Sequence, residues 1–176
     1  MAFTRVAGVL LAAGQGSRFG RPKALVELDG QTLAERGVGL LRAGGADPVL
    51  IVTGAAQVEL GAEAQVRTVY NAEWPTGMGS SLRAALRALA EPNVGPDVGA
   101  AVVALADQPL VGAAAVSRLI AAYRAGASVA VAGYDGKPRN PVLLAREHWP
   151  EVIAMATALR RMSGPSGSPV NTCSQR

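Results

Sequence analysis

Three glycines follow an apolar run near the beginning of the chain. The segment LAAGQGSRFGRPKAL, residues 11–25, overlaps the end of this run and contains Gly14, Gly16 and Gly20. Because glycine has no Cβ, backbone N–H groups in such a loop can approach a phosphate chain closely. Open α/β sheets bind their ligands at the carboxyl ends of strands, which is where this loop would lie. The pattern predicts a phosphate-binding loop suited to a nucleotide.

Two cations stand in the same loop. Arg18 offers a planar fork of N–H donors, and Lys23 offers a compact charge on a flexible stem. The chain has 17 basic residues, yet Lys23 and Lys137 are its two lysines. A lysine placed directly after Pro22 in a glycine-rich loop favours a phosphate contact over a solvated surface position. We predict that Arg18 and Lys23 are catalytic and bind phosphate oxygens.

The spacing of the glycines, GxGxxxG, is also a variant of dinucleotide-binding loops with one additional residue. A dinucleotide fold expects an acidic residue about twenty positions beyond the loop, where it holds the ribose. The end of the second predicted strand carries Thr53 and Gly54 instead. The missing carboxylate favours a nucleoside triphosphate, and an NAD(P)H-dependent reductase is the alternative.

A carboxylate ends a second buried run. Asp107 follows the apolar residues 100–106 and precedes Gln108 and Pro109. At the edge of a sheet beside a phosphate loop, a carboxylate is the hard oxygen ligand that suits Mg²⁺. The alternative is an N-cap for the next helix, for which Pro109 gives poor geometry. We predict that Asp107 is catalytic and binds Mg²⁺.

A third signal is the segment NAEWPTGMGSSL, residues 71–82, which brings Ser80 and Ser81 to the start of a helix. Helix N-termini bind anions, so these serines are candidates for contact with a nucleotide. Simple helix capping by either serine is the equal alternative. We expect Trp74 to be a packing residue, and His148, the one histidine, has no role in this interpretation.

These loops need a sheet to position them. Strand-length apolar runs alternate with helical patterns, which indicates a three-layer α/β/α fold around a Rossmann-like, mostly parallel sheet. The predicted strands are residues 6–12, 48–54, 65–71, 100–107 and 128–134, with a turn and returning strand at 135–145. The predicted helices are residues 32–45, 80–91 (with a serine N-cap), 112–126 and a segment after Pro150. We expect one domain over residues 1–162 and a disordered or atypical tail over residues 163–176.

Composition limits the classes of function. The chain has 176 residues, of which 49% are hydrophobic and 17% charged, as in a globular domain. Its net charge of +4 is spread along the chain, which argues against a nucleic-acid partner. The apolar run at residues 6–14 is about half of the ~20 residues that span a bilayer, so we expect no membrane partner, and a signal peptide is a weaker alternative. A single cysteine, Cys173, predicts a cytoplasmic location.

Three motifs occur in the order LAAGQGSRFGRPKAL, NAEWPTGMGSSLRAAL and ALADQP. In these motifs the chain resembles the MobA-like nucleotidyltransferases, and it looks most like their molybdenum cofactor cytidylyltransferase branch. The resemblance covers residues 6–162 and implies a nucleotidyltransferase A-like fold. It also implies Mg²⁺-dependent transfer of CMP from CTP to a phosphorylated acceptor such as the molybdopterin cofactor, with release of pyrophosphate. Contact with a molybdoenzyme or its chaperone is a further implied partnership.

The resemblance assigns roles residue by residue. It implies base contacts from Ala12, Ala13 and Gly14, and LAAG in place of the LAGG of guanylyltransferases implies CTP over GTP. The implied nucleotide-binding set is Leu11, Ala12, Ala13, Gly14, Gly16, Ser17, Lys23, Asn71, Gly77, Ser80 and Ser81.

The chain departs from the family's pattern in two places. Residues 139–141 read RNP where the cytidylyltransferases have GHP, and the text after residue 162 differs from the family's. These departures keep a catalytically inactive nucleotide-binding relative as a second alternative.

Overall fold

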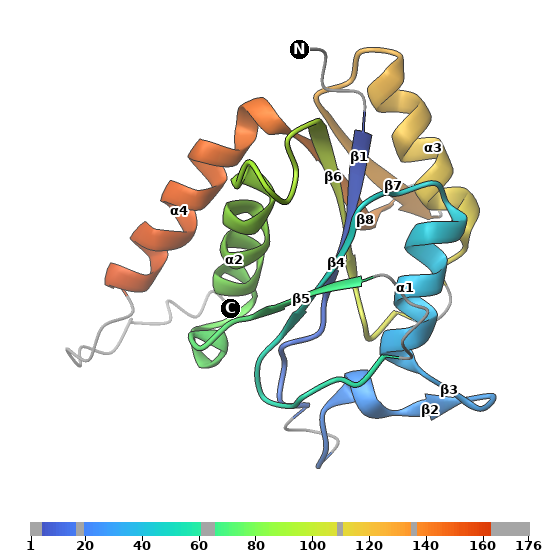
Figure 1. Cartoon of the computed structure of the whole chain (residues 1–176), viewed down its shortest axis with the longest axis vertical. Helices are drawn as coiled ribbons and strands as arrows, with labels where there is room; N and C mark the ends of the chain where they lie inside the picture. Colours follow the sequence, from blue (N-terminus) through green and yellow to red (C-terminus); the bar gives the residue numbers. More distant parts are fainter. Residues whose placement is uncertain (1–4, 17–19, 61–65, 109–110, 135–136, 163–176) are drawn as a thin grey trace, which may run out of the picture.

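The computed structural model describes residues 5–16, 20–60, 66–108, 111–134 and 137–162 of the chain. Within these residues, six strands form one sheet in the order β5-β4-β1-β6-β8-β7 (Figure 1). The strands are β1 (Arg5–Leu11), β4 (Val49–Thr53), β5 (Val66–Tyr70), β6 (Val98–Leu105), β7 (Val129–Tyr134) and β8 (Lys137–Ala145). The predicted tail, residues 163–176, lies outside the described residues.

The sheet is mostly parallel, as predicted. Strand β1 pairs in parallel with β4 and β6, and β4 pairs in parallel with β5. Strand β8 is the returning strand, antiparallel to both β6 and β7. The chain goes from β1 outward to β4 and β5 and then crosses to β6 on the other side of β1. The order of the sheet therefore reverses between β1 and β6, which is where such sheets form ligand crevices.

Helices cover both faces of this sheet. They are α1 (Leu33–Ala43), α2 (Met78–Ala90), α3 (Ala113–Arg124) and α4 (Trp149–Met162). Helices α1 and α3 lie on one face, and α2 and α4 lie on the other (Figure 1). Along β1, Val6 and Leu10 pack toward α1 and α3, whereas Ala7 and Val9 pack toward α2. A strand buried on both faces explains the uninterrupted apolar run, and the predicted three-layer fold is confirmed.

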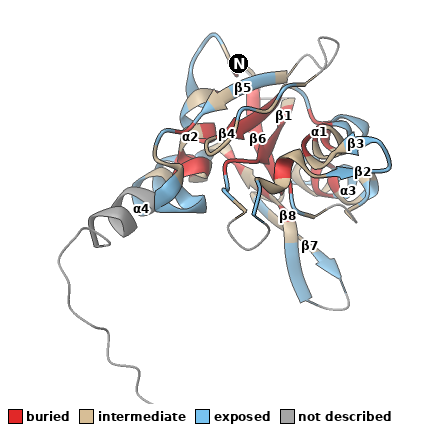
Figure 2. Cartoon of the chain, turned by 90° about the horizontal axis from the view of Figure 1, so that it is seen from below, coloured by how far each residue is buried: buried red, intermediate tan, exposed pale blue. Residues whose placement is uncertain are grey.

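Short elements fill the connection between β1 and α1. They are η1 (Lys23–Leu25), β2 (Glu27–Leu28) and β3 (Gln31–Thr32). Helix α1 then begins with a capping box, in which Thr32 Oγ1 accepts from Glu35 N at 3.2 Å and Thr32 N donates to Glu35 Oε2 at 2.7 Å. Seen from below in Figure 2, the buried central strands reach the carboxyl edge, and the β2–β3 and β7–β8 hairpins are more exposed.

Helix α2 corrects one prediction. It begins at Met78 rather than at Ser80, and its N-cap is Gly77, so a serine N-cap is wrong. The physical reason is the φ of 109° at Gly77, a left-handed conformation that lets the chain enter the helix two residues earlier. Helix α4 also begins earlier than predicted, at Trp149 rather than after Pro150. Pro150 lies in its first turn, where the missing N–H would have no helical partner.

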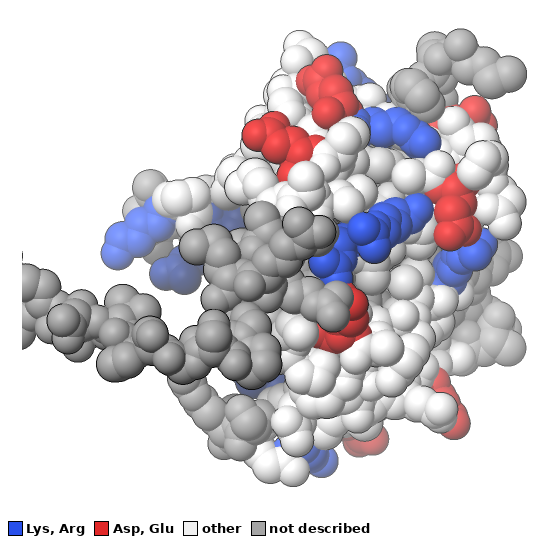
Figure 3. Space-filling model, turned by 90° about the vertical axis from the view of Figure 1, so that its left-hand side faces the viewer, with Lys and Arg blue, Asp and Glu red and all other residues white. Residues whose placement is uncertain are grey.

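No helix in the described part of the chain combines the length and the apolar character that crossing a bilayer requires. On the face seen in Figure 3, the described acidic and basic side chains are interspersed. The described residues of that face form no continuous basic surface of the kind that follows a nucleic-acid backbone.

Candidate active site

A cleft of about 560 Å³ opens at the carboxyl ends of β1 and β6, where the order of the sheet reverses. Its floor continues the two strands, because Ala106 N donates to Leu11 O at 3.1 Å and Ala12 N donates to Val52 O at 2.9 Å. The cleft is lined by Leu11, Ala12, Ala13, Gly14, Gly16, Lys23, Ala24, Trp74, Gly77, Met78, Ser81, Leu105, Ala106 and Asp107. Residues from all three predicted motifs therefore meet in one place.

The glycine loop forms one side of this cleft. Gly16 has a φ of 63°, and a Cβ there would collide with the carbonyl oxygen of Arg21, so the turn requires glycine. At Gly14 a Cβ would meet no atom within 4 Å and would project into open space. The loop is thus built so that a ligand can approach its backbone closely at Gly14.

The two charged side chains of the cleft contact each other. Lys23 Nζ, at the start of η1, lies 3.0 Å from Asp107 Oδ2, two residues beyond the end of β6. The side chains of Lys23 and Asp107 are 41% and 40% exposed, so solvent and ligands can reach both. Asp107 does not cap α3, whose N-cap is Gly112, and the capping alternative is therefore wrong.

The donor set limits how a metal ion could be held. The described residues contain no group of three or more His, Cys, Asp or Glu side chains that could hold a metal, and Asp107 is the carboxylate that lines the cleft. Mg²⁺ is commonly bound by one or two carboxylates together with substrate phosphates and water. The cleft therefore suits a Mg²⁺ ion that arrives with a phosphate chain, and it offers no preformed cage.

The loop of residues 71–77 and the start of α2 form the opposite side. Gly77 and Ser81 line the cleft, as the sequence indicated. Asn71 and Ser80 are buried behind this wall instead, where Asn71 Nδ2 donates to Ser80 Oγ at 2.8 Å and to Ser81 Oγ at 3.0 Å. Neither Asn71 nor Ser80 is among the lining residues, and both brace the wall from within.

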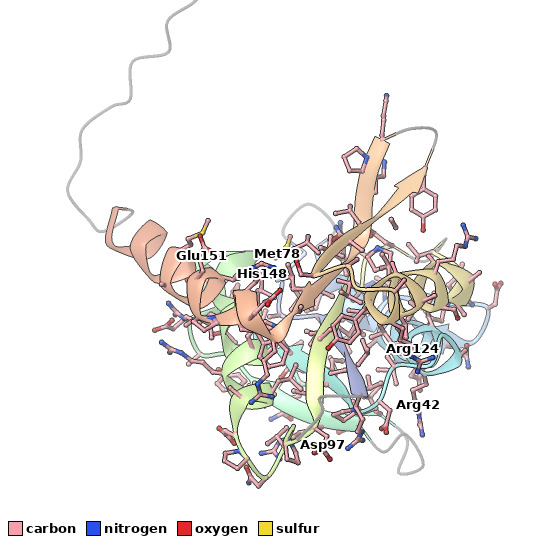
Figure 4. The ribbon with its side chains drawn as sticks, turned by 90° about the horizontal axis from the view of Figure 1, so that it is seen from above. Arg42, Met78, Asp97, Arg124, His148 and Glu151 are labelled. Carbon is pink, nitrogen blue, oxygen red and sulfur yellow. The ribbon has the colours of Figure 1, made fainter. Side chains whose placement is uncertain are left out.

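Sequence reasoning did not assign five of the lining residues to the site, namely Ala24, Trp74, Met78, Leu105 and Ala106. Trp74 packs against the core cluster, as expected, and also lines the cleft together with Met78, which is 60% exposed (labelled in Figure 4). Their place in a glycine-rich loop between a strand and a helix was the available signal. Arg18 and Ser17 lie outside the described residues, so their roles stay predictions.

Comparisons with known proteins place this arrangement in a family. The model of the MobA-like NTP transferase domain matches residues 8–166. Nicotine blue oxidoreductase of Paenarthrobacter nicotinovorans is 40% identical over 152 residues, covering 84% of this chain and 70% of that protein. A probable molybdenum cofactor guanylyltransferase of Opitutus terrae is 37% identical over 160 residues, covering 89% of this chain and 72% of that protein.

A solved structure has the same fold. The Mycobacterium tuberculosis rv0371c homolog from Mycobacterium sp. strain JC1 has a TM-score of 0.72 at 31% identity, covering 93% of this chain and 83% of that chain. The family model, which matches residues 8–166, includes the glycine loop, the wall formed by residues 71–81 and the Lys23–Asp107 pair. The chain therefore belongs to the family of MobA-like NTP transferases.

Proposed function

We propose that this protein transfers a nucleoside monophosphate, CMP from CTP, to a phosphorylated acceptor of the molybdopterin type. An oxygen of the acceptor's terminal phosphate attacks the α-phosphorus of CTP. A new P–O bond forms to the acceptor, the bond between the α-phosphorus and its bridging oxygen breaks, and pyrophosphate leaves with the electron pair. The acceptor class is supported by the 37% identical relative, whose name is probable molybdenum cofactor guanylyltransferase.

The observation that carries this proposal is the Lys23–Asp107 contact of 3.0 Å beside an open glycine loop. A metal-bound triphosphate presents anionic phosphate oxygens, which suit the Lys23 ammonium, and a hard metal cation, which suits the Asp107 carboxylate. The loop would hold the phosphates, Lys23 and Arg18 would neutralise them, and Asp107 would hold Mg²⁺. The metal would supply charge neutralisation on the phosphate oxygens, and the chain's own groups would supply position.

The choice of CTP rests on the floor of the cleft. Ala13 is a lining residue that is buried in the core cluster on the α2 side of the sheet, and the resemblance gives the guanylyltransferases a glycine at this place, in LAGG. The larger residue would leave a narrower floor. A narrower floor favours a pyrimidine over the larger guanine. The guanylyltransferase name of one relative points the other way, so the base is a direct question for experiment.

An NAD(P)H-dependent reduction is the second candidate, because a 40% identical relative is named nicotine blue oxidoreductase. Dinucleotide-binding loops lead straight into a helix whose N-terminus holds the pyrophosphate. Here η1 and the β2–β3 hairpin intervene, and α1 begins at Leu33. This local structure supports nucleotidyl transfer over hydride transfer.

Thermal shift of the purified protein with CTP, GTP, ATP, UTP and NADPH, each with and without Mg²⁺, tests the proposal. A ligand at 100 times its Kd stabilises a protein by about 2.7 kcal/mol, which is about 5–10 °C for a chain of this size. We expect the largest, Mg²⁺-dependent shift with CTP, followed by pyrophosphate release when the acceptor is added. A shift with NADPH alone would favour the reductase, and binding of CTP without turnover would indicate the inactive relative.

A further inference from the structure

A buried cation stands behind the wall of the cleft. Arg83 lies in α2 among small and apolar residues, and its side chain is 6% exposed. Its guanidinium forms an ion pair with the carboxylate of Glu73, in the loop that precedes the helix. Burying a guanidinium is costly unless it is paired and hydrogen-bonded, so the position of Glu73 is strongly constrained by Arg83.

Glu73 is also fixed through its backbone. Its N–H donates to Asn71 Oδ1 at 3.0 Å, and its carbonyl oxygen accepts from Ser80 Oγ at 2.9 Å. Asn71 in turn donates to Ser80 and Ser81 at the start of α2. The loop is therefore tied to the helix by a polar network that ends in the Arg83–Glu73 ion pair.

This loop has one apolar anchor, the half-buried Trp74, which packs against the core cluster on the α2 side of the sheet. Trp74 directly follows Glu73, and no residue of η3 (Trp74–Thr76) is buried. Gly77 and Met78 complete the wall, and both are exposed. Residues 75–79 of the wall are exposed, so apart from Trp74 the position of the wall depends on its polar ties.

We infer that Arg83 is a positioning residue of the nucleotide cleft, which acts through Glu73 to hold Trp74 and Met78 in place against a bound nucleotide. Arg83 is not among the residues that line the cleft, so it acts without touching the ligand. The inference rests on the proposed nucleotide-binding function. It predicts that breaking the Arg83–Glu73 ion pair raises the Kd and KM for the nucleotide and leaves kcat nearly unchanged.

The test compares Arg83→Met with Arg87→Met, a matched change at an exposed arginine of the same helix. The Kd for CTP with Mg²⁺ is measured by calorimetry, and KM and kcat by pyrophosphate release. For Arg83→Met we expect Kd and KM to rise about tenfold, within the range for coupled neighbours, with kcat within about twofold. Arg83→Lys, which keeps the charge, should recover part of the loss, and Arg87→Met should match the wild type.

Acrylamide quenching of tryptophan fluorescence adds a readout without ligand. Trp149 is fully buried and shielded from the quencher, so the quenchable signal comes mainly from Trp74. We expect stronger quenching in Arg83→Met than in Arg87→Met. If Arg83→Met does not fold, the double variant Glu73→Gln/Arg83→Met leaves no unpaired buried charge and is measured in its place.

The outcomes separate the two proposals. Wild-type affinity together with wild-type quenching in the folded variant would overturn the positioning role of Arg83. A loss of thermal stability with unchanged Kd and quenching would do the same, because it would show a purely structural ion pair. Failure of the wild type to bind any nucleoside triphosphate would instead refute the proposed function, and the quenching comparison would still decide whether Arg83 holds the wall.

Discussion

Lys23 Nζ lies 3.0 Å from Asp107 Oδ2, although 84 positions separate the two residues in the chain. The two residues form an ion pair in the cleft. When a metal-bound triphosphate binds, we expect its phosphate oxygens to pair with Lys23 and the metal ion to pair with Asp107. Both interactions should be stronger than the Lys23–Asp107 ion pair that they replace. Binding of nucleotide and metal should for this reason be coupled, each favouring the other.

The first prediction concerns Lys23. Lys23→Ala should lower the rate of pyrophosphate release about 10²–10³-fold, as loss of one preorganised charge at a transferring phosphate does. Thermal stability should change little, because half-exposed ion pairs contribute only about 0.2–1 kcal/mol. The control is Lys137→Ala, an exposed lysine on β8. Comparable rates for the two variants would remove Lys23 from the mechanism.

The second prediction concerns Asp107 and the metal. In the wild type, Mg²⁺ should tighten CTP binding about 5–150-fold, the usual range for coupled ligands. Asp107→Asn keeps the size of the side chain but removes its charge, and should abolish most of this enhancement. Calorimetric titration of CTP with and without Mg²⁺ measures the ratio directly. Asp29→Asn, at an exposed carboxylate of the β2–β3 turn, should keep the full ratio, and an unchanged ratio in Asp107→Asn would exclude it as the metal ligand.

The third prediction separates Gly14 from Gly16, the two lining glycines of the glycine loop. Gly16→Ala should lower stability and nucleotide affinity together, because its Cβ meets the Arg21 carbonyl in a left-handed turn. Gly14→Ala should leave the melting temperature unchanged and weaken nucleotide binding, because its Cβ enters the open cleft. Gly39→Ala, in α1 and with open space around it, should stabilise the protein by about 0.5–1 kcal/mol without affecting binding. Full affinity in Gly14→Ala would show that phosphates do not approach there.

The fourth prediction concerns the base. Ala13→Gly removes one buried methyl group from a residue that lines the cleft, and should widen the floor and lower the preference for CTP over GTP by about tenfold or more. The ratio of kcat/KM for the two nucleotides in the same variant is the measurement, since a general loss of stability affects both equally. An unchanged ratio would locate base selection elsewhere in the cleft.

Local patterns were sufficient for most of the fold. The apolar runs predicted β1, β4 and β6, because strands buried on both faces need apolar side chains at every position. The glycines of residues 11–25 predicted a ligand loop at the carboxyl end of β1, and the structure has a cleft there. Such features depend on neighbours within one element, so the sequence alone determined them.

Contacts between distant elements needed the tertiary structure. Whether Ser80 and Ser81 cap a helix or lie inside it depended on the left-handed turn at Gly77. It also depended on Asn71, which lies in the preceding loop and donates hydrogen bonds to both hydroxyl groups. The sequence predicted that Trp74 packs, which is confirmed, and only the folded structure showed that it also lines the cleft. The Arg83–Glu73 and Lys23–Asp107 pairs likewise arise only when separate segments fold together. The sequence by itself determined the main strands and helices and the place of the glycine loop, and the packing of those elements decided which charges meet, because a charge finds its partner in space rather than along the chain.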